Sequence, residues 1–261
     1  MIESITILGG IGKSGEAEPV GRMDMAMGDV VSVVGPTGSG KTTLINDIEL
    51  FADANTPTGR RILINGLPAP AEYKENPAFN PIALITQHTT FLSDMPVQDF
   101  LETHARIRSG RAEEMAEMIR RTTDFANQLT GEPILLHSRM TELSGGQTRA
   151  LLIADATIIC NTPIVLLDEV ENAGIHRARA LELLRQYRKI FIFVTHDPRI
   201  ALLSDFRVVM QGGRIMKVLR TDGEEQRFAR EVSRLDDGLS LLREKIRRGE
   251  RLTGTLAEVL S

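Results

Sequence analysis

The strongest constraint on the fold is a glycine-rich segment at residues 35–43, which reads Gly-Pro-Thr-Gly-Ser-Gly-Lys-Thr-Thr. Its first eight residues match the phosphate-binding pattern G-x-x-x-x-G-K-[ST]. The apolar run Val30–Val34 precedes it and a helical pattern follows, so backbone N–H groups and a helix N-terminus can converge on one anion. We therefore expect a P-loop that binds a nucleotide through Gly35, Pro36, Thr37, Gly38, Ser39, Gly40, Lys41, Thr42 and Thr43.

Three side chains of this segment have separate expected tasks. Lys41 is expected to bridge the β- and γ-phosphates of ATP, the Thr42 hydroxyl to ligate Mg²⁺, and Thr43 to contact the α-phosphate. Residues 12–15, Gly-Lys-Ser-Gly, look like the end of a second P-loop. No glycine precedes them by five residues and no helical pattern follows, so we interpret them as an ordinary loop.

Two carboxylates follow a second apolar run. Residues 164–169 read Ile-Val-Leu-Leu-Asp-Glu, so Asp168 is placed to reach Mg²⁺ and Glu169 to act as the general base toward the attacking water. His196 follows the apolar run Ile190–Val194, and its ring can reach the γ-phosphate from a neighbouring strand. The alternatives are a solvated acidic turn and a structural histidine. The other four histidines show no metal-ligand spacing, and we interpret them as surface or structural residues.

The apolar pattern predicts an α/β fold. Continuous β-branched runs suit strands covered on both faces, as in a parallel sheet, and a strand–helix–strand order indicates a βαβ unit. Many prolines at residues 53–81 predict loop and edge strand rather than helix, and the stretch between the first two strands reads as a loop rich in glycine and methionine. We expect strands at 5–8, 30–34, 61–65, 82–86, 164–167 and 190–194, and helices at 97–108, 111–129 and 177–187.

A signature sequence turns this nucleotide-binding prediction into a family resemblance. Residues 143–147 read Leu-Ser-Gly-Gly-Gln, about a hundred residues after the P-loop. Over residues 1–220 the chain resembles the ATP-binding cassette (ABC) ATPases, because five motifs occur in their order. These are the Walker A loop 35–43, a Q-loop at Gln87, the signature 143–147, Walker B at 164–169 and the switch His196.

The resemblance implies a P-loop NTPase fold with several parts. It implies a mostly parallel core sheet, an antiparallel β-lobe that includes the hairpin 58–66, and a helical subdomain at about 88–145. Residues 1–220 would form the ATP-binding domain, and residues 221–261 a charged C-terminal helical extension. In the extension an apolar stripe follows a 3-4-3-4 spacing, and we expect it to pack on its own domain, with a partner-docking helix as the alternative. The stripe consists of Val232, Leu235, Leu239, Leu242 and Ile246.

The resemblance also implies a mechanism. Two cassettes pair head to tail, and each ATP lies between one Walker A loop and the opposite signature. Ser144, Gly145, Gly146 and Gln147, at the start of a helix beginning near Gln147, would then complete the site of the partner chain. Gln87 would sense Mg²⁺ and water and couple the site to a partner protein. The implied catalytic residues are Glu169, His196, Gln87 and Lys41, and the implied metal ligands are Thr42, Gln87 and Asp168.

The chain departs from the family pattern in three places. No aromatic residue precedes Phe51, so the usual side chain that stacks on adenine is missing, and Arg22 or a methionine such as Met23 is a candidate substitute. Val170 stands where a proline usually follows the catalytic glutamate. Ile175 replaces the usual aspartate of the D-loop. None of these changes removes a residue that we expect to hold phosphate, metal or water.

Composition and charge limit the classes of partner that the chain can have. The chain has 261 residues, of which 42% are hydrophobic, enough for a sizeable core. Its net charge is −4 and its pI is about 5.8, so it has no general attraction for nucleic acid. A basic cluster at 243–251 suits a solvated helix end. A single cysteine, Cys160, excludes an internal disulfide, and we expect a buried, inert thiol. No apolar run is long enough to span a bilayer and no secretory signal starts the chain. We expect a soluble, cytoplasmic protein that reaches a membrane only through a partner.

Three functions remain at this stage. The first is an ATPase subunit, paired with a second ABC subunit in a homodimer, that energises an integral-membrane transporter partner. The second is a soluble ABC ATPase that remodels or assembles a client protein without transport. The third, a nucleic-acid-associated ATPase, is the least supported. A protein that binds ATP without hydrolysing it is disfavoured, because Glu169 and His196 are both present.

Overall fold

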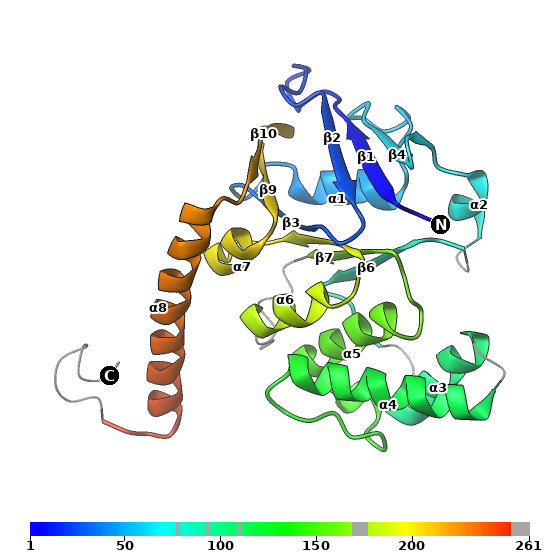
Figure 1. The fold of residues 1–261 in the computed structure, drawn as a ribbon, viewed down its shortest axis with the longest axis vertical. Coiled ribbons are helices and arrows are strands. Elements are labelled where there is room, and N and C mark those ends of the chain that lie inside the picture. The colour runs from blue at the N-terminus through cyan, green and yellow to red at the C-terminus, as the bar shows by residue number, and fades with distance from the viewer. Residues whose placement is uncertain (77–78, 92–93, 109–110, 169–176, 252–261) are drawn as a thin grey trace.

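The computed structural model describes residues 1–261 except 77–78, 92–93, 109–110, 169–176 and 252–261. The predictions for Glu169, Val170 and Ile175, and for the last residues of the tail, therefore lie outside the described residues. Figure 1 shows a central sheet with an antiparallel sheet above it and a group of helices below. The helix α8 runs along one side of the molecule.

The central sheet has six strands in the order β10-β9-β3-β8-β7-β6. The five strands from β9 to β6 are parallel, and β10 pairs antiparallel at one edge, so the predicted mostly parallel core sheet is confirmed. The apolar run 82–86, bounded by Pro81, was expected to form a buried strand, and that expectation needs correction. It forms the edge strand β6, in which only Ile85 is fully buried, because a neighbouring strand covers it on one side alone. The strands are β3 Val30–Val34, β6 Ile82–Thr86, β7 Ile164–Asp168, β8 Ile190–Val194, β9 Phe206–Gln211 and β10 Arg214–Arg220.

The second sheet is antiparallel, in the order β2-β1-β4-β5, as the predicted β-lobe requires. The stretch that we expected to be only a loop contains β2, in which Met23 and Met25 are buried and their neighbours exposed. Methionine has little preference for strands, so the two-residue alternation was the only signal. The strands are β1 Ser4–Leu8, β2 Arg22–Ala26, β4 Arg61–Ile64 and β5 Leu67–Pro68.

The three predicted helices are present as α3, α4 and α6, and the ends of two of them differ by one or two residues from the prediction. A short helix, α2, lies inside residues 53–81, where we expected none, and begins directly after Pro70. Proline is tolerated at the start of a helix because the first backbone N–H groups have no partner inside it. The helices are α1 Lys41–Glu49, α2 Ala71–Glu75, α3 Val97–Arg108, α4 Ala112–Leu129, η1 Met140–Glu142, α5 Gly145–Thr157, α6 Arg177–Arg185, α7 Pro198–Leu203 and α8 Gly223–Arg247.

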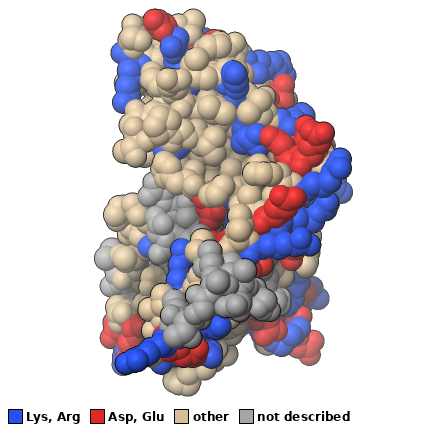
Figure 2. Space-filling model, turned by 90° about the vertical axis from the view of Figure 1, so that its left-hand side faces the viewer, with Lys and Arg blue, Asp and Glu red and all other residues tan. Residues whose placement is uncertain are grey.

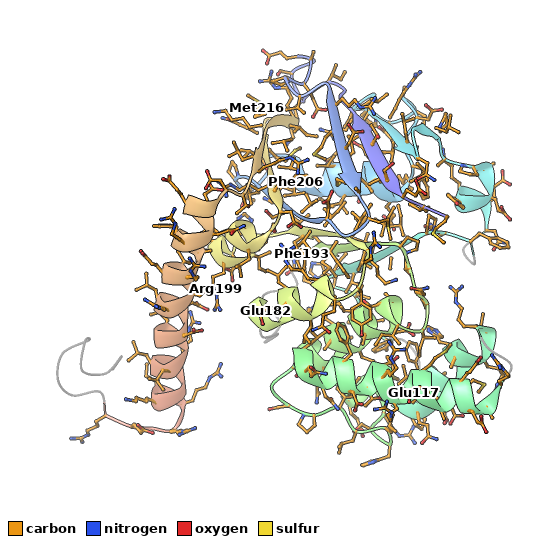
Figure 3. All side chains as sticks on the ribbon, in the orientation of Figure 1. Glu117, Glu182, Phe193, Arg199, Phe206 and Met216 are labelled. Atoms are coloured by element: carbon orange, nitrogen blue, oxygen red, sulfur yellow. The ribbon has the colours of Figure 1, made fainter. Side chains whose placement is uncertain are left out.

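The central sheet separates two hydrophobic cores. In β7, Val165 and Leu167 pack toward α3, α4, α5 and α6, whereas Ile164 and Leu166 pack toward α1 and the antiparallel sheet. Successive side chains of a strand point to opposite faces, so a continuous apolar run fills both cores. In Figure 3, Phe193 of β8 lies on the side that faces the lower helices. Because the strands are buried on both faces, their positions are fixed, and so are their carboxyl ends, where the candidate site lies.

The helix α8 is attached to the domain mainly through its first half. Ala229 is fully buried, and Arg199 of α7 forms ion pairs with Asp236 and with Asp237 at 3.6 Å, reaching across to α8 (Figure 3). The expectation that the whole apolar stripe packs on its own domain is wrong, because Leu235, Leu239 and Ile246 are exposed. Figure 2, which views this side, shows basic and acidic side chains intermixed. Among the described residues, no helix is both long and apolar enough to span a bilayer.

Candidate functional site

The site is built at one edge of the central sheet, where four parallel strands end. Asp168, the last residue of β7, lies in register with Thr86 of β6 and with Val194 of β8. Val194 is in turn paired with Val33 of β3. Segments that leave these strands therefore emerge side by side, as expected for ligand sites in parallel sheets.

The P-loop leaves β3 in a backbone shape that requires glycine. Gly35, Gly38 and Gly40 have φ values of 152°, 76° and 100°, which side chains strongly disfavour. A Cβ on Gly35 would lie 2.3 Å from the carbonyl oxygen of Met210, so no other residue fits there. Gly40 also caps α1, so the first free N–H groups of that helix face the loop.

Lys41 starts α1 and its side chain curls back over the loop. Its Nζ donates hydrogen bonds to the carbonyl oxygens of Gly35, at 2.9 Å, and Pro36, at 3.2 Å. The residue is only 7% exposed. The ammonium group is therefore held within the loop, and the same donors can turn to phosphate oxygens.

A cleft of about 230 Å³ opens beside this loop. It brings together Asp168 from β7, His196 from the segment after β8, and most of the P-loop. Gly35 and Pro36 line an adjoining hollow that shares His196, and Ser39 is buried beneath the loop. The described residues that line the cleft are Lys13, Thr37, Gly38, Gly40, Lys41, Thr42, Thr43, Asp168, Val194 and His196.

Lys13 is a cleft residue that sequence reasoning missed. Residues 12–15 do form a loop, as expected, but the Nζ of Lys13 donates a hydrogen bond of 2.8 Å to the carbonyl oxygen of Gly38. The backbone N–H of Lys13 donates to Gly212 at 3.0 Å, which places this loop between the P-loop and the β9–β10 turn. The similarity of residues 12–15 to the end of a P-loop was the only feature of the sequence that could have pointed to Lys13 as a cleft residue.

A buried arginine ties these segments together. The guanidinium of Arg60, which is fully buried, contacts Glu18 at 2.6 Å, Asp47 of α1 at 2.8 Å and the carbonyl oxygen of Gly213 at 2.7 Å. Burial opposes its charge, but the hydrogen bonds and charges of Glu18 and Asp47 outweigh it, so the pKa of Arg60 is raised. The arginine therefore fixes α1 relative to the segments that flank the cleft.

Gln87 follows β6, but its side chain is not among the described residues that line the cleft. Its Nε2 lies 3.2 Å from the Nε2 of His88. The carbonyl oxygen of Gln87 accepts a hydrogen bond from Nη2 of Arg149, whose Nη1 donates to the carbonyl oxygen of Gly145 at 3.0 Å. Arg149, which sequence reasoning also missed, thus joins the Gln87 segment to the start of α5.

The signature segment forms the N-terminus of α5, which begins at Gly145, two residues before the predicted start. The Oγ of Ser144 accepts a hydrogen bond from the N–H of Gln147 at 3.3 Å, and the Gln147 side chain accepts one from the N–H of Ser144 at 2.9 Å. This capping box leaves Ser144 and Gly145 exposed. Neither residue is among those described as lining the cleft of the same chain.

The two candidates for holding adenine differ in the structure. Met23 is 5% exposed and packs into the core beneath β2, so it is unsuited to stack on a base. Arg22 is exposed, and its Nε lies 2.9 Å from Asp24 in an ion pair. Of the two proposed substitutes, only Arg22 remains available at the surface.

The chain is similar in sequence to ATP-binding proteins of ABC transporters. The family model described as ABC transporter matches residues 21–172. The chain is 47% identical over 252 residues to an uncharacterized ABC transporter ATP-binding protein of Methanocaldococcus jannaschii, covering 97% of this chain and 95% of that protein. It is 32% identical to the sulfate/thiosulfate import ATP-binding protein CysA of Mesorhizobium japonicum, covering 77% of this chain and 58% of that protein.

Solved structures with the same fold are also ATP-binding cassettes. One is cbiO1 from Clostridium perfringens, described as part of the ABC transporter complex cbiONQ, with a TM-score of 0.65 and 23% identity over 95% of this chain and all of the other. Another is a dimeric cassette in a post-hydrolysis state bound to ADP and Pi, with a TM-score of 0.63 and 20% identity over 84% of this chain and 99% of the other. These similarities establish the shared fold.

Proposed function

The chain belongs to the ABC transporter family of ATP-hydrolysing cassettes, and we propose that it is the subunit that energises an integral-membrane transporter partner. In this proposal it works at the cytoplasmic face of the membrane. The observation that carries the proposal is the cleft in which the P-loop, Asp168 and His196 meet. The 32% identity to the sulfate/thiosulfate import ATP-binding protein supports the transport role.

ATP would lie with its triphosphate in this cleft. Lys41 would move from the carbonyl oxygens of the loop to the β- and γ-phosphates, and the N-terminus of α1 would add partial positive charge beneath them. Thr43 would contact the α-phosphate. Lys13 would add a second cation at the rim, because its ammonium group lies 2.8 Å from the carbonyl oxygen of Gly38.

The oxygen donors of the cleft fit Mg²⁺. The Thr42 hydroxyl and the Asp168 carboxylate line the same space, and hard oxygen ligands are the type that Mg²⁺ prefers. When bound, the ion would neutralise charge on the phosphate oxygens. Gln87, the third candidate ligand, would first have to turn from His88 toward the cleft.

Glu169 would be the general base of hydrolysis. It follows Asp168 directly in the sequence. A carboxylate there would orient water for attack on the γ-phosphate and accept its proton. His196, which lines the cleft, would contact the same phosphate.

The signature would act on a second copy of the chain. Ser144 and Gly145 are exposed at a helix N-terminus and are not among the described residues that line the cleft of their own chain, so in this proposal a second copy would bring a phosphate to them. Since one chain carries every motif, a head-to-tail homodimer would contain two equal sites. Residues 1–220 would form the ATP-binding domain, with a helical subdomain at about 88–145, and residues 221–261 its extension.

A soluble client protein is the second candidate partner. The exposed apolar side chains of α8, at Leu235, Leu239 and Ile246, favour contact with another protein. In that function ATP hydrolysis would remodel or assemble the client without transport.

Native co-purification distinguishes the two candidates. A tagged chain is recovered from detergent-solubilised membranes of cells that express it at its natural level, and from the soluble fraction in parallel. The transport proposal predicts a stoichiometric partner with membrane spans that ATP and Mg²⁺ do not displace. Recovery of soluble partners alone would overturn it and favour the client protein.

A further inference from the structure

A cluster of three potential metal ligands lies away from the nucleotide cleft. His104 is on α3, Asp155 is in the last turn of α5, and Cys160 follows α5. The side-chain ligand atoms of all three lie within 4.8 Å of one another. These residues line neither of the two hollows around the P-loop.

The geometry points to a Zn²⁺-binding site formed by His104, Asp155 and Cys160. The Nδ1 of His104 is 2.8 Å from Oδ2 of Asp155, and the Sγ of Cys160 is 3.6 Å from the same oxygen. A tetrahedral Zn²⁺ ion keeps such ligand atoms about 3.3 to 3.8 Å apart, given its bond lengths of about 2.0 to 2.3 Å. Small side-chain rotations are enough to reach that spacing.

The carboxylate of Asp155 gives a second reason to assign a ligand. The residue is 5% exposed, and its Oδ1 is a buried atom without a hydrogen-bond partner. A buried, unpaired carboxylate oxygen is costly, and coordination of a cation would satisfy it. The mixture of one nitrogen, one oxygen and one sulfur suits Zn²⁺ better than Mg²⁺ or Ca²⁺, which prefer oxygen ligands alone.

Backbone and ring contacts position the three ligand residues near one another. The N–H of Cys160 donates to the carbonyl oxygen of Asp155 at 2.9 Å, which fixes the thiol relative to the carboxylate. The ring of His104 lies against Phe100, with 4.3 Å between ring centres, and its side chain is 33% exposed. An aspartate and a thiolate balance the two charges of Zn²⁺, and the exposed side leaves room for water as fourth ligand.

Occupation of this site would brace α3 against α5. The N-terminus of α5 carries Ser144, so the ion would hold the far end of the helix that presents the signature. The expectation that Cys160 is buried is wrong, because the residue is only partly buried and its thiol lies beside the Asp155 carboxylate. No short motif in the sequence predicts this site, because His104 and Asp155 lie 51 positions apart.

Cobalt spectroscopy tests the assignment, because Co²⁺ takes the place of Zn²⁺ and absorbs when a thiolate binds it. Metal-free, nucleotide-free protein is titrated with Co²⁺ at mildly alkaline pH, since binding displaces protons from the ligands. The proposal predicts a thiolate-to-cobalt band that saturates at about one equivalent. The band should disappear in Cys160→Ser and in His104→Gln, and persist in His137→Gln, a substitution of an exposed histidine.

Protection of the thiol gives a second measurement on the unaltered chain. Cys160 is the only cysteine, so alkylation by iodoacetamide reports on this site alone. Zn²⁺ should slow alkylation of the wild-type protein at least about tenfold, because a coordinated thiolate is no longer free to react. Absence of the cobalt band, or equal alkylation rates with and without Zn²⁺, would overturn the assignment.

Discussion

The guanidinium of Arg60 and the carboxylate of Glu18 form an ion pair of 2.6 Å in which both side chains are fully buried. The same carboxylate accepts hydrogen bonds from the backbone N–H groups of Gly10, at 2.9 Å, and Ile215, at 2.6 Å. One buried pair therefore joins the loop after β1, the start of β4 and the start of β10. These segments surround the P-loop, so its shape depends on a contact between residues 42 positions apart.

The first prediction concerns this pair. Arg60→Met leaves Glu18 and Asp47 as buried, uncompensated carboxylates, and should lower the free energy of unfolding by about 3 to 5 kcal/mol. Arg61→Met is the matched control, because Arg61 is exposed and its ion pair with Asp53 lies at the surface. Urea unfolding of both variants measures the difference. Equal stability of the two variants would show that the buried pair does not hold the fold together.

The second prediction concerns Lys13. Its ammonium group lies at the rim of the cleft, where it would face phosphate, so Lys13→Met should weaken ATP binding about two- to fivefold. Lys74→Met, an exposed lysine of α2, is the control and should bind ATP as the wild type does. Equilibrium titration with a fluorescent ATP analogue measures both. An unchanged affinity of Lys13→Met for ATP would mean that Lys13 does not contribute to ATP binding.

The sequence predicted the parts of the site that depend on local backbone chemistry. The P-loop could be recognised because three glycines and a lysine must stand at fixed spacing for the backbone to surround an anion. Lys13 and Arg60 could not, because each acts through contacts with residues 25 and 42 positions away. Their role depends on how the antiparallel sheet packs on α1, which no short pattern records.

The predicted strands and helices also divide into those that local sequence determines and those that it does not. The apolar runs of β3 and β8 were predicted with their observed bounds, because short runs of β-branched and aromatic residues favour strands covered on both faces. The strand β2 was missed because its buried positions are methionines, and α2 because prolines surround it. In β2, tertiary packing outweighs the weak local preference for a strand.

The third prediction concerns Arg149. Its side chain joins the carbonyl oxygens of Gln87 and Gly145, so Arg149→Met should uncouple these segments. We expect ATP binding to stay within about twofold of wild type, while turnover falls about tenfold or more. Arg121→Met, at an exposed position of α4, should change neither quantity. Loss of ATP affinity equal to the loss of turnover would contradict a coupling role.

The fourth prediction concerns Lys41. Lys41→Ala removes the cation that the loop carbonyls hold, so ATP affinity itself should fall about tenfold or more, since hydrogen bonds to charged groups contribute about 1.5 to 3 kcal/mol. Isothermal titration measures the affinity, and circular dichroism checks that the fold is intact. A folded variant with wild-type affinity would mean that the triphosphate lies elsewhere.

Glu169→Gln gives the most direct test of the account, in which the ATP site is completed by Ser144 of a second copy. The substitution keeps the size of the side chain but removes the base, so ATP should bind without turnover. Sedimentation of this variant with ATP and Mg²⁺ should show a dimer, and the double variant with Ser144→Arg should stay monomeric because the arginine blocks the closed interface. A Glu169→Gln protein that binds ATP yet remains a monomer, or hydrolyses ATP at the wild-type rate, would contradict the account.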